Sequence, residues 1–269
     1  MQRLKTGIVG CGAMGSEIAR ACRDRLRGSI DLVAVCDIDA AKAKSLSDSL
    51  GGVSATAIDE LIGAVDLVVE AASASVSGSV LEKCVNAGKA CLIMSVGGLL
   101  GKENVLRQAA DSGVRVFIPS GALCGIDGLK SASVGKIESV TLTTRKPPRG
   151  LEGAPYIKEK GIDLSLIKAQ TVIFEGSAEE AVKGFPANVN VSAVLSLAGI
   201  GAKRTRVRIV TSPDYTKNTH EVEITGDCGK ITTRTDNVPS EANPKTSALA
   251  IYSAIATLEG IARSVRIGT

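Results

Sequence analysis

Three glycines near the start of the chain have the spacing of a dinucleotide-binding turn. They are Gly10, Gly12 and Gly15, in the pattern Gly-x-Gly-x-x-Gly. The first glycine of such a turn permits a sharp change of direction, the second lets a pyrophosphate approach the backbone, and the third lets a helix pack against a strand. The helix would begin at Ala13 and Met14, where free N–H groups and the positive end of the helix dipole favour phosphate. We therefore predict that these five residues bind a dinucleotide.

A carboxylate follows the glycines at the separation that a ribose contact requires. Residues 30–36 form an apolar segment, and Asp37 comes directly after it. About 20 residues beyond the last glycine, an acidic side chain in this fold hydrogen-bonds the adenosine ribose. Asp37 favours NAD because it would repel the 2′-phosphate of NADP, whereas the nearby Lys42 and Lys44 leave the use of NADP open. The alternative is an ordinary turn with a capping Asp, but the order of strand, glycines, helix, strand and acid favours a dinucleotide site.

His220 is the only histidine in the chain and the first candidate for proton transfer. A dehydrogenase that oxidises a C–O or C–N bond needs a group that exchanges protons near neutral pH, and histidine does so without a large pKa shift. The alternative is a surface histidine at a strand edge. Lys203 is the next candidate for acid–base chemistry. We expect Glu221, Asp227 or Asp163 to orient the imidazole, although Glu221 is adjacent in a strand and so points to the opposite face.

The first part of the chain predicts a Rossmann-type, doubly wound parallel sheet with helices on both faces. Apolar segments and helical segments alternate up to about residue 120, which is typical of this architecture. Ligands of such sheets bind beyond the carboxyl ends of the strands. Three of these ends are rich in small residues, at 71–75 (including Ala72), 95–98 and 120–125. We predict that they admit the nicotinamide half of the cofactor, although small residues also simply make tight turns.

A different pattern in the second part predicts an α+β domain with an open mixed or antiparallel sheet. Residues 139–145, 205–211, 221–225 and 230–235 alternate between apolar and polar side chains, and helices are expected at 177–183 and 190–198. We place the dinucleotide-binding domain at 1–121 and a substrate and oligomerisation domain at 122–245. A last helix in 246–269 should pack back onto the first domain. The open sheet needs a cover, so we expect a homodimer.

Composition excludes several classes of protein. The chain has 269 residues and a net charge of +4, with three Phe, three Tyr and no Trp, so we expect no nucleic-acid partner. The basic runs 145–149 and 203–208 are interpreted as solvated faces or as a weak attraction for an anionic substrate. Seven scattered cysteines indicate free thiols, and no metal site is expected. With no secretory signal and no apolar run long enough for a bilayer, we expect a cytoplasmic protein.

Several segments together resemble the L-aspartate dehydrogenase family. They are the glycine turn at 10–15, Ser120-Gly121-Ala122 with Gly125-Ile126-Asp127-Gly128, Phe185-Pro186-Ala187-Asn188-Val189-Asn190-Val191, Thr219-His220-Glu221 and Asn243-Pro244-Lys245-Thr246-Ser247. The resemblance covers essentially the whole chain. It implies NAD(P)-dependent oxidative deamination of L-aspartate to iminoaspartate, which hydrolyses to oxaloacetate and ammonia, at the first step of de novo NAD biosynthesis. It also implies that Ala122 and Asn188 contact the nicotinamide side of the cofactor and that His220 is catalytic.

The two carboxylates of L-aspartate need cationic or amide donors. Candidates are Asn190, Lys203, Thr219 and Ser120, which the sequence does not rank. We hypothesise that neutral His220 accepts a proton from the substrate amine or from the attacking water. Rival interpretations are a homoserine dehydrogenase-like or dihydrodipicolinate reductase-like enzyme, the latter usually with more histidines, and a non-catalytic NAD sensor.

Overall fold

The computed structural model describes residues 3–186, 189–240, 246–265 and 267–268. The chain divides into two compact units. Unit 1 comprises Met1–Pro119 and Ile251–Arg266, and unit 2 comprises Ser120–Ala250 and Ile267–Thr269. Each unit has its own cluster of buried apolar side chains, as expected of separate folding units.

Unit 1 is built on a six-stranded parallel sheet. Its strands are β1 (Leu4–Val9), β2 (Ile30–Cys36), β3 (Ser54–Ala55), β4 (Leu67–Glu70), β5 (Ala90–Ile93) and β6 (Val116–Phe117). They lie in the order β3-β2-β1-β4-β5-β6, and each strand runs parallel to its neighbours. The order reverses next to β1, so the carboxyl end of β1 is the place where such sheets bind their ligands.

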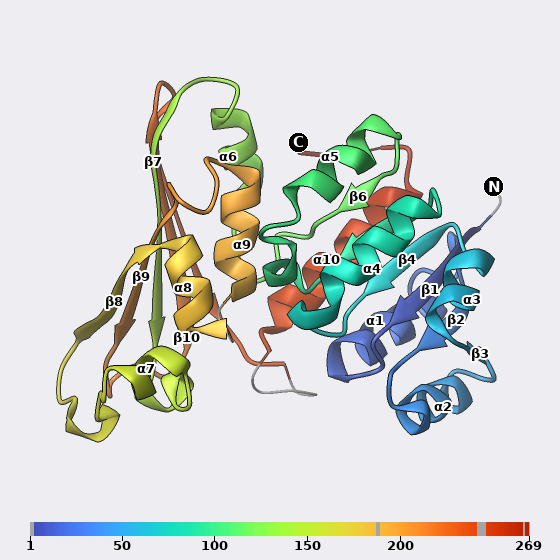
Figure 1. The fold of residues 1–269 in the computed structure, drawn as a ribbon, viewed down its shortest axis with the longest axis horizontal. Helices are drawn as coiled ribbons and strands as arrows, with labels where there is room; N and C mark the ends of the chain where they lie inside the picture. Colours follow the sequence, from blue (N-terminus) through green and yellow to red (C-terminus); the bar gives the residue numbers. More distant parts are fainter. Residues whose placement is uncertain (1–2, 187–188, 241–245, 266, 269) are drawn as a thin grey trace. The chain divides into compact units, whose positions relative to one another are not determined.

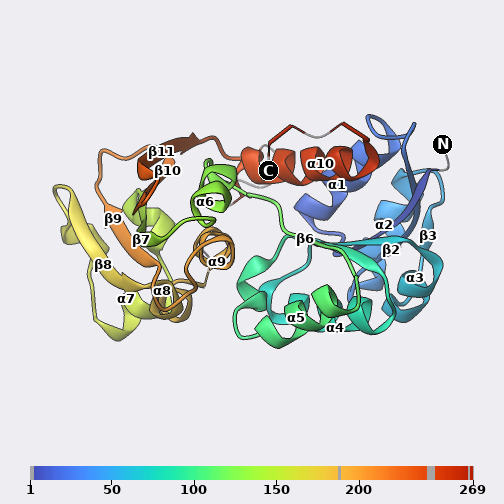
Figure 2. The same cartoon turned by 90° about the horizontal axis from the view of Figure 1, so that it is seen from above.

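Helices cover both faces of this sheet. They are α1 (Ala13–Arg23), α2 (Ala40–Ser49), α3 (Ile58–Ala64), α4 (Ala74–Asn86), the 3₁₀ turn η1 (Val96–Leu99), α5 (Glu103–Asp111) and α10 (Ala248–Ala262). Figure 2 shows α1 and α10 on one face and α3, α4 and α5 on the other. From α10, Ile251, Ala254 and Leu258 are buried in the core of unit 1. The predicted doubly wound architecture is confirmed.

Unit 2 contains a five-stranded mixed sheet. Its strands are β7 (Ile137–Lys146), β8 (Thr171–Ser177), β9 (Arg206–Thr211), β10 (Asn218–Gly226) and β11 (Gly229–Asn237). They lie in the order β11-β10-β7-β9-β8. The pair β7–β9 is parallel and the other three pairs are antiparallel. The predicted second sheet is confirmed, with β8 as a strand that the sequence did not indicate.

One face of the second sheet carries helices and the core of unit 2. The helical elements are α6 (Ile126–Ala132), η2 (Pro148–Leu151), α7 (Pro155–Glu159), η3 (Leu164–Leu166), α8 (Ala178–Gly184) and α9 (Val189–Ala198). Figure 1 draws α6, α8 and α9 along this face, where Leu142 and Val222 are buried. The opposite face carries ion pairs such as Arg145–Glu221 at 3.3 Å and Lys230–Glu223 at 2.6 Å. Of the helices in the described part of the chain, none is both long and apolar enough to cross a bilayer.

Candidate active site

The glycine turn of unit 1 has the geometry that a pyrophosphate cradle requires. Gly10 has φ +102°, and a Cβ on Gly15 would lie 1.8 Å from the carbonyl oxygen of Gly10. A Cβ on Gly12, in contrast, would meet nothing within 4 Å. Two glycines are therefore required by the fold itself, whereas the space above Gly12 is open for a ligand.

The N-terminus of α1 is suited to an anion. Gly12 is the N-cap residue and so provides no capping side chain, and the first helical turn has no acidic residue. Ala13 and Met14, which begin the helix, are half-buried. The backbone N–H groups at this end and the helix dipole favour a phosphate. The turn thus fits the pyrophosphate of a dinucleotide.

Asp37 connects the end of β2 to the glycine turn. Its Oδ2 accepts a hydrogen bond from the Cys11 N–H at 2.7 Å, and its Oδ1 accepts one from the Asp39 N–H at 2.9 Å. The half-buried carboxylate is thereby held beside the turn. Lys42 and Lys44 were the residues that kept NADP as a possible cofactor. Both form exposed ion pairs, Lys42 with Asp39 at 3.5 Å and Lys44 with Asp48 at 3.3 Å.

A second carboxylate, Glu70, organises the neighbouring loops and was not singled out from the sequence. It ends β4, is fully buried, and accepts hydrogen bonds from the N–H groups of Ala72 at 2.8 Å and Ser95 at 2.9 Å. Burial raises the pKa of Glu70, against the opposing effect of these hydrogen bonds. Glu70 therefore fixes two of the small-residue loops predicted to admit the nicotinamide, and the exposed side chain of Ala72 lies on one of them. The sequence feature that could have indicated Glu70 is an acidic residue at the end of an apolar segment.

His220 lies in unit 2 on β10, on the face that carries the core. Its side chain is buried, and its Nδ1 lies 3.0 Å from the Thr144 hydroxyl on β7. Burial, followed by the charge of Lys146, lowers the pKa of His220 to about 3. The imidazole is therefore neutral at physiological pH, and one of its two ring nitrogens carries a lone pair.

Lys146 is a buried cation close to this histidine. It ends β7, two residues beyond Thr144 and so on the same face of the sheet. Only 8% of its surface is exposed, and burial lowers its pKa to about 8. The interpretation of the basic run 145–149 as a solvated face is thus wrong for Lys146, because the sheet register turns this side chain inward.

The same end of the second sheet holds the loop around Ala122. Ala122 is buried, and its carbonyl oxygen accepts a hydrogen bond from Asn237 Nδ2 at 3.2 Å. Asn237 ends β11, where it pairs with Asn218, two residues before His220. Its Oδ1 accepts a hydrogen bond from the Ser247 hydroxyl at 2.5 Å. The structure therefore brings Ala122, a predicted cofactor contact, to the sheet end that carries His220.

The structure locates three of the other predicted substrate contacts, Thr219, Lys203 and Asn190, on different elements of unit 2. Thr219 is on the opposite face of β10 and donates a hydrogen bond to Asp236 Oδ1 at 2.6 Å. Lys203 is exposed in the turn before the first residue of β9. Lys146 pairs with Thr211, at the other end of that strand. Asn190 is exposed in the first turn of α9. Asn188 and the Asn-Pro-Lys segment 243–245 lie outside the described residues.

The three acids considered for orienting the imidazole make other contacts. Glu221 pairs with Arg145 on the opposite face, Asp227 accepts from the Lys136 N–H at 3.0 Å, and Asp163 accepts from the Ser165 N–H at 2.9 Å. The orienting group on Nδ1 is instead the hydroxyl of Thr144, which the sequence analysis did not find. Thr144 is 76 residues away from His220 in sequence, and strand register alone brings the two together.

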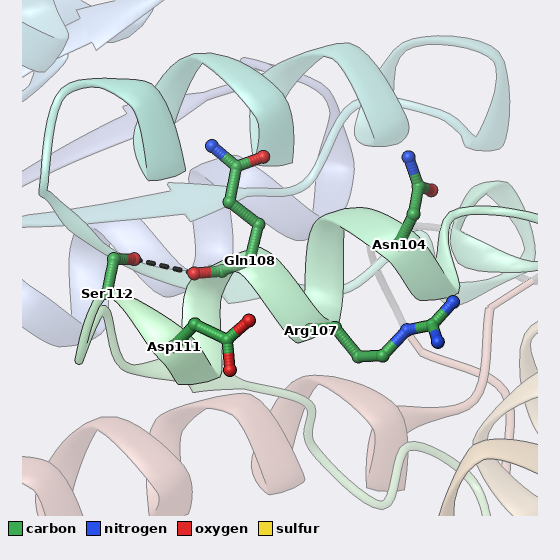
Figure 3. A pocket seen from close by; sticks show the side chains of 5 residues that line it. All are labelled: Asn104, Arg107, Gln108, Asp111 and Ser112. Carbon is green, nitrogen blue, oxygen red and sulfur yellow. Dashed lines mark hydrogen bonds between the residues drawn. The ribbon is translucent and has the colours of Figure 1, made fainter.

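Figure 3 shows a surface pocket on α5 that is separate from these groups. Polar side chains of this one helix and its end line it, and the Ser112 hydroxyl donates to the Gln108 carbonyl at 2.7 Å. A second pocket lies next to the glycine turn, with Cys11, Ser16 and Lys42 in its lining. Within the described residues, no group of three or more His, Cys, Asp or Glu could hold a metal ion.

Two family profiles match successive parts of the chain. The profile described as "Homoserine dehydrogenase, NAD binding domain" matches residues 10–119, and "Aspartate dehydrogenase, C-terminal" matches residues 127–261. The chain belongs to the aspartate dehydrogenase family. The second profile decides this, because it covers the half of the chain that carries His220, Thr144 and Lys146.

Full-length relatives agree with this assignment. The chain is 48% identical to L-aspartate dehydrogenase from Methanosarcina mazei, over 99% of this chain and 100% of the relative. It is 40% identical to L-aspartate dehydrogenase from Bradyrhizobium diazoefficiens, over 99% and 94%. The crystal structure of aspartate dehydrogenase from Thermotoga maritima superposes with a TM-score of 0.76 at 26% identity, over 99% and 100% of the two chains. The resemblance to the L-aspartate dehydrogenase family is confirmed.

Proposed function

We propose that this protein is an NAD(P)-dependent L-aspartate dehydrogenase that oxidises L-aspartate to iminoaspartate, which then hydrolyses to oxaloacetate and ammonia. The observation that carries the proposal is His220, a neutral buried imidazole held by Thr144 at 3.0 Å. The glycine turn of unit 1 and membership of the family support it. A non-catalytic NAD sensor would have no use for a buried proton acceptor beside a buried lysine.

The geometry suggests how the chain handles protons. In the required tautomer, Nδ1–H of His220 donates to the Thr144 hydroxyl, which leaves Nε2 free as an acceptor. The ammonium group of the substrate must lose a proton before its Cα–H can leave as hydride, and Nε2 accepts that proton. The nicotinamide ring, when bound, supplies the hydride acceptor. Gly12 and the start of α1 would hold its pyrophosphate, and Asp37 its adenosine ribose.

A direct assay tests the reaction. Purified protein with NAD and L-aspartate should form NADH, followed at 340 nm, while L-homoserine, L-glutamate and L-malate should give little or no signal. Oxidation of homoserine in place of aspartate would instead support the homoserine dehydrogenase alternative. Binding of NADH without oxidation of any of the four substrates would support a sensor.

We further propose that NAD is the preferred cofactor, because the Asp37 carboxylate is held beside the glycine turn by two backbone N–H groups. Asp37→Asn keeps an oxygen acceptor but removes the charge. Loss of the repulsion should raise the ratio of kcat/KM for NADP to that for NAD on the order of 10-fold. Asp48→Asn, which changes an exposed carboxylate of α2, is the control. An unchanged ratio in Asp37→Asn would show that this carboxylate does not select the cofactor.

The proposal places the enzyme in the cytoplasm, at the first step of de novo NAD biosynthesis, as the family resemblance implies. It also includes a homodimer that covers the face of the second sheet opposite α6, α8 and α9, where Val172 is exposed. Light scattering should then give twice the 27.6 kDa of one chain. A mass of one chain would remove the dimer from the proposal.

A further inference from the structure

Glu70 joins two loops at the carboxyl end of the sheet of unit 1. Its Oε1 accepts a hydrogen bond from the Ala72 N–H at 2.8 Å, and its Oε2 accepts one from the Ser95 N–H at 2.9 Å. Ala72 follows β4 and Ser95 follows β5, and these two strands are parallel neighbours. A single carboxyl group therefore sets the separation of the chain segments that leave the two strands.

Ser95 is held at its carbonyl group as well. Ser77 of α4 is fully buried, and its hydroxyl donates a hydrogen bond to the Ser95 carbonyl oxygen at 2.7 Å. The turn η1, which begins after Ser95, packs so closely against the start of α4 that Gly98 has no room for a Cβ beside the Ala74 carbonyl. The segments after β4 and β5 are therefore coupled to each other, with Glu70 between them.

The loop after β4 also lies against the glycine turn. A Cβ on Gly10 would lie 2.6 Å from the Ala72 nitrogen. The Ala71 N–H donates a hydrogen bond to the Val9 carbonyl oxygen at 2.8 Å, which continues the pairing of β1 and β4 to the edge of the sheet. The position of Ala72, which Glu70 fixes, is thus matched to the place where the pyrophosphate is expected.

The strand order divides the cofactor between the two sides of β1. Asp37, the expected ribose contact, follows β2 on one side, whereas Glu70 ends β4 on the other. A dinucleotide whose pyrophosphate lies at the glycine turn then extends its adenosine half over β2 and its nicotinamide half over β4 and β5. The loops on this second side, 71–75 and 95–98, consist mostly of small residues, so their positions depend on backbone contacts.

We propose that Glu70 is a positioning residue for the nicotinamide half of the cofactor, because it sets the positions of the loops at Ala72 and Ser95 that border this half. This inference rests on the proposed function. Glu70 is fully buried, so it acts through the loops and does not touch the cofactor. Loss of either hydrogen bond would leave a buried N–H group without its acceptor, and the loop would shift to satisfy it.

Glu70→Gln tests the proposal, since it keeps the size of the side chain but offers one acceptor oxygen where the carboxylate offers two. Calorimetry would compare NADH with ADP, which lacks the nicotinamide half. We expect the Kd for NADH to rise about 10-fold, the effect of one unsatisfied buried group. The Kd for ADP should stay within about 2-fold, because its expected contacts are the glycine turn and Asp37.

Two further variants make the comparison specific. Asp66 precedes the other end of β4, and its exposed carboxylate also accepts a backbone hydrogen bond, from the Lys5 N–H at 3.2 Å. Asp66→Asn should therefore bind NADH and ADP as the wild type does. Ser77→Ala releases the Ser95 carbonyl, and it should weaken NADH binding about 3-fold without a change for ADP. Where Glu70→Gln does not fold, as judged by circular dichroism, Ser77→Ala takes its place.

The pattern of losses decides the inference. An equal loss for NADH and ADP would show that Glu70 supports the glycine turn alone, and an unchanged Kd for NADH would show that it positions nothing that the cofactor uses. Either result overturns the proposal, as does a wild type that binds no NADH. Because neither titration needs turnover, a selective loss of NADH affinity supports the inference even where L-aspartate is not oxidised. Oxidation of L-aspartate with no selective loss would support the proposed function and overturn the inference.

Discussion

Replacement of His220 by alanine should lower kcat for L-aspartate by about 10²–10⁴-fold, the usual contribution of a positioned acid–base group. The affinity for NADH, measured by fluorescence titration, should not change, because the predicted pyrophosphate and ribose contacts lie in unit 1. Thr144→Val is the matched variant, since it keeps the shape of the side chain and removes the hydroxyl that lies 3.0 Å from Nδ1. We expect it to lose about 10-fold in kcat through misorientation of the ring. Near-normal turnover by His220→Ala would remove His220 from the mechanism.

His220 should also make the free energy of unfolding depend on pH. Burial and Lys146 lower the pKa of His220 to about 3, so the unfolded chain binds a proton near pH 6.5 that the folded chain does not. The free energy of unfolding should therefore decrease as pH falls from 7 towards 3, because protonation favours the unfolded state. Lys146 acts in a separate window, since its lowered pKa of about 8 makes stability rise with pH only between about pH 8 and its ordinary pKa of 10.5. Urea titrations at pH 7 and pH 5 should show a smaller pH effect in His220→Ala than in the wild type.

The parts of the site that the sequence predicted are local patterns. The glycines at 10, 12 and 15 and the carboxylate at 37 form a spacing pattern within one strand–helix–strand unit, so composition and order were enough to predict them. His220 was predicted because it is the only histidine. Thr144 and Lys146 carry no such local signal, since their burial follows from the register between β7 and β10. That register depends on packing across the sheet, which a single strand does not encode.

Of the elements of unit 2 that the sequence did not predict, β8 and α6 were missed for identifiable physical reasons. In β8, Val172, Ile173 and Phe174 are consecutive apolar residues, and a shift of register between Val172 and Phe174 interrupts the alternation that marks a half-exposed strand. In α6, Gly125 and Gly128 lower helix propensity, and the helix has only seven residues. Packing of Leu129 and Ala132 into the core of unit 2 stabilises α6 despite its composition.

Substrate contacts were the least predictable part of the site. Thr219 was chosen for its type and for its position next to His220, but adjacent residues of a strand point to opposite faces. Lys203 was chosen for its charge, yet it is exposed beyond the remote end of β9. The type of a residue shows whether it can bind an anion. The face of the sheet on which it lies decides whether its side chain shares a site with His220.

Alanine at Gly12 and at Gly15 should separate cofactor binding from folding. At Gly15 the new Cβ would lie 1.8 Å from the Gly10 carbonyl oxygen, so the backbone must move. We expect Gly15→Ala to lose about 1–3 kcal/mol or more of stability, in the range of overpacked sites. Gly12 has φ −73°, which alanine adopts freely, and its Cβ would meet nothing within 4 Å. The free energy of unfolding of Gly12→Ala should therefore equal that of the wild type or exceed it slightly.

Gly15→Ala should mainly lower stability, whereas Gly12→Ala should mainly weaken cofactor binding. The methyl group at position 12 occupies the space through which a pyrophosphate would approach the backbone, so Gly12→Ala should weaken NADH binding on the order of 100-fold while it remains folded. A concentration of NADH that saturates the wild type should then raise the melting temperature of the wild type more than that of Gly12→Ala, since stabilisation depends on the ratio of ligand concentration to Kd. Normal NADH affinity in Gly12→Ala would show that the open space above this glycine is not the pyrophosphate site. Normal stability in Gly15→Ala would show that the close contact between α1 and the turn is not required by the fold.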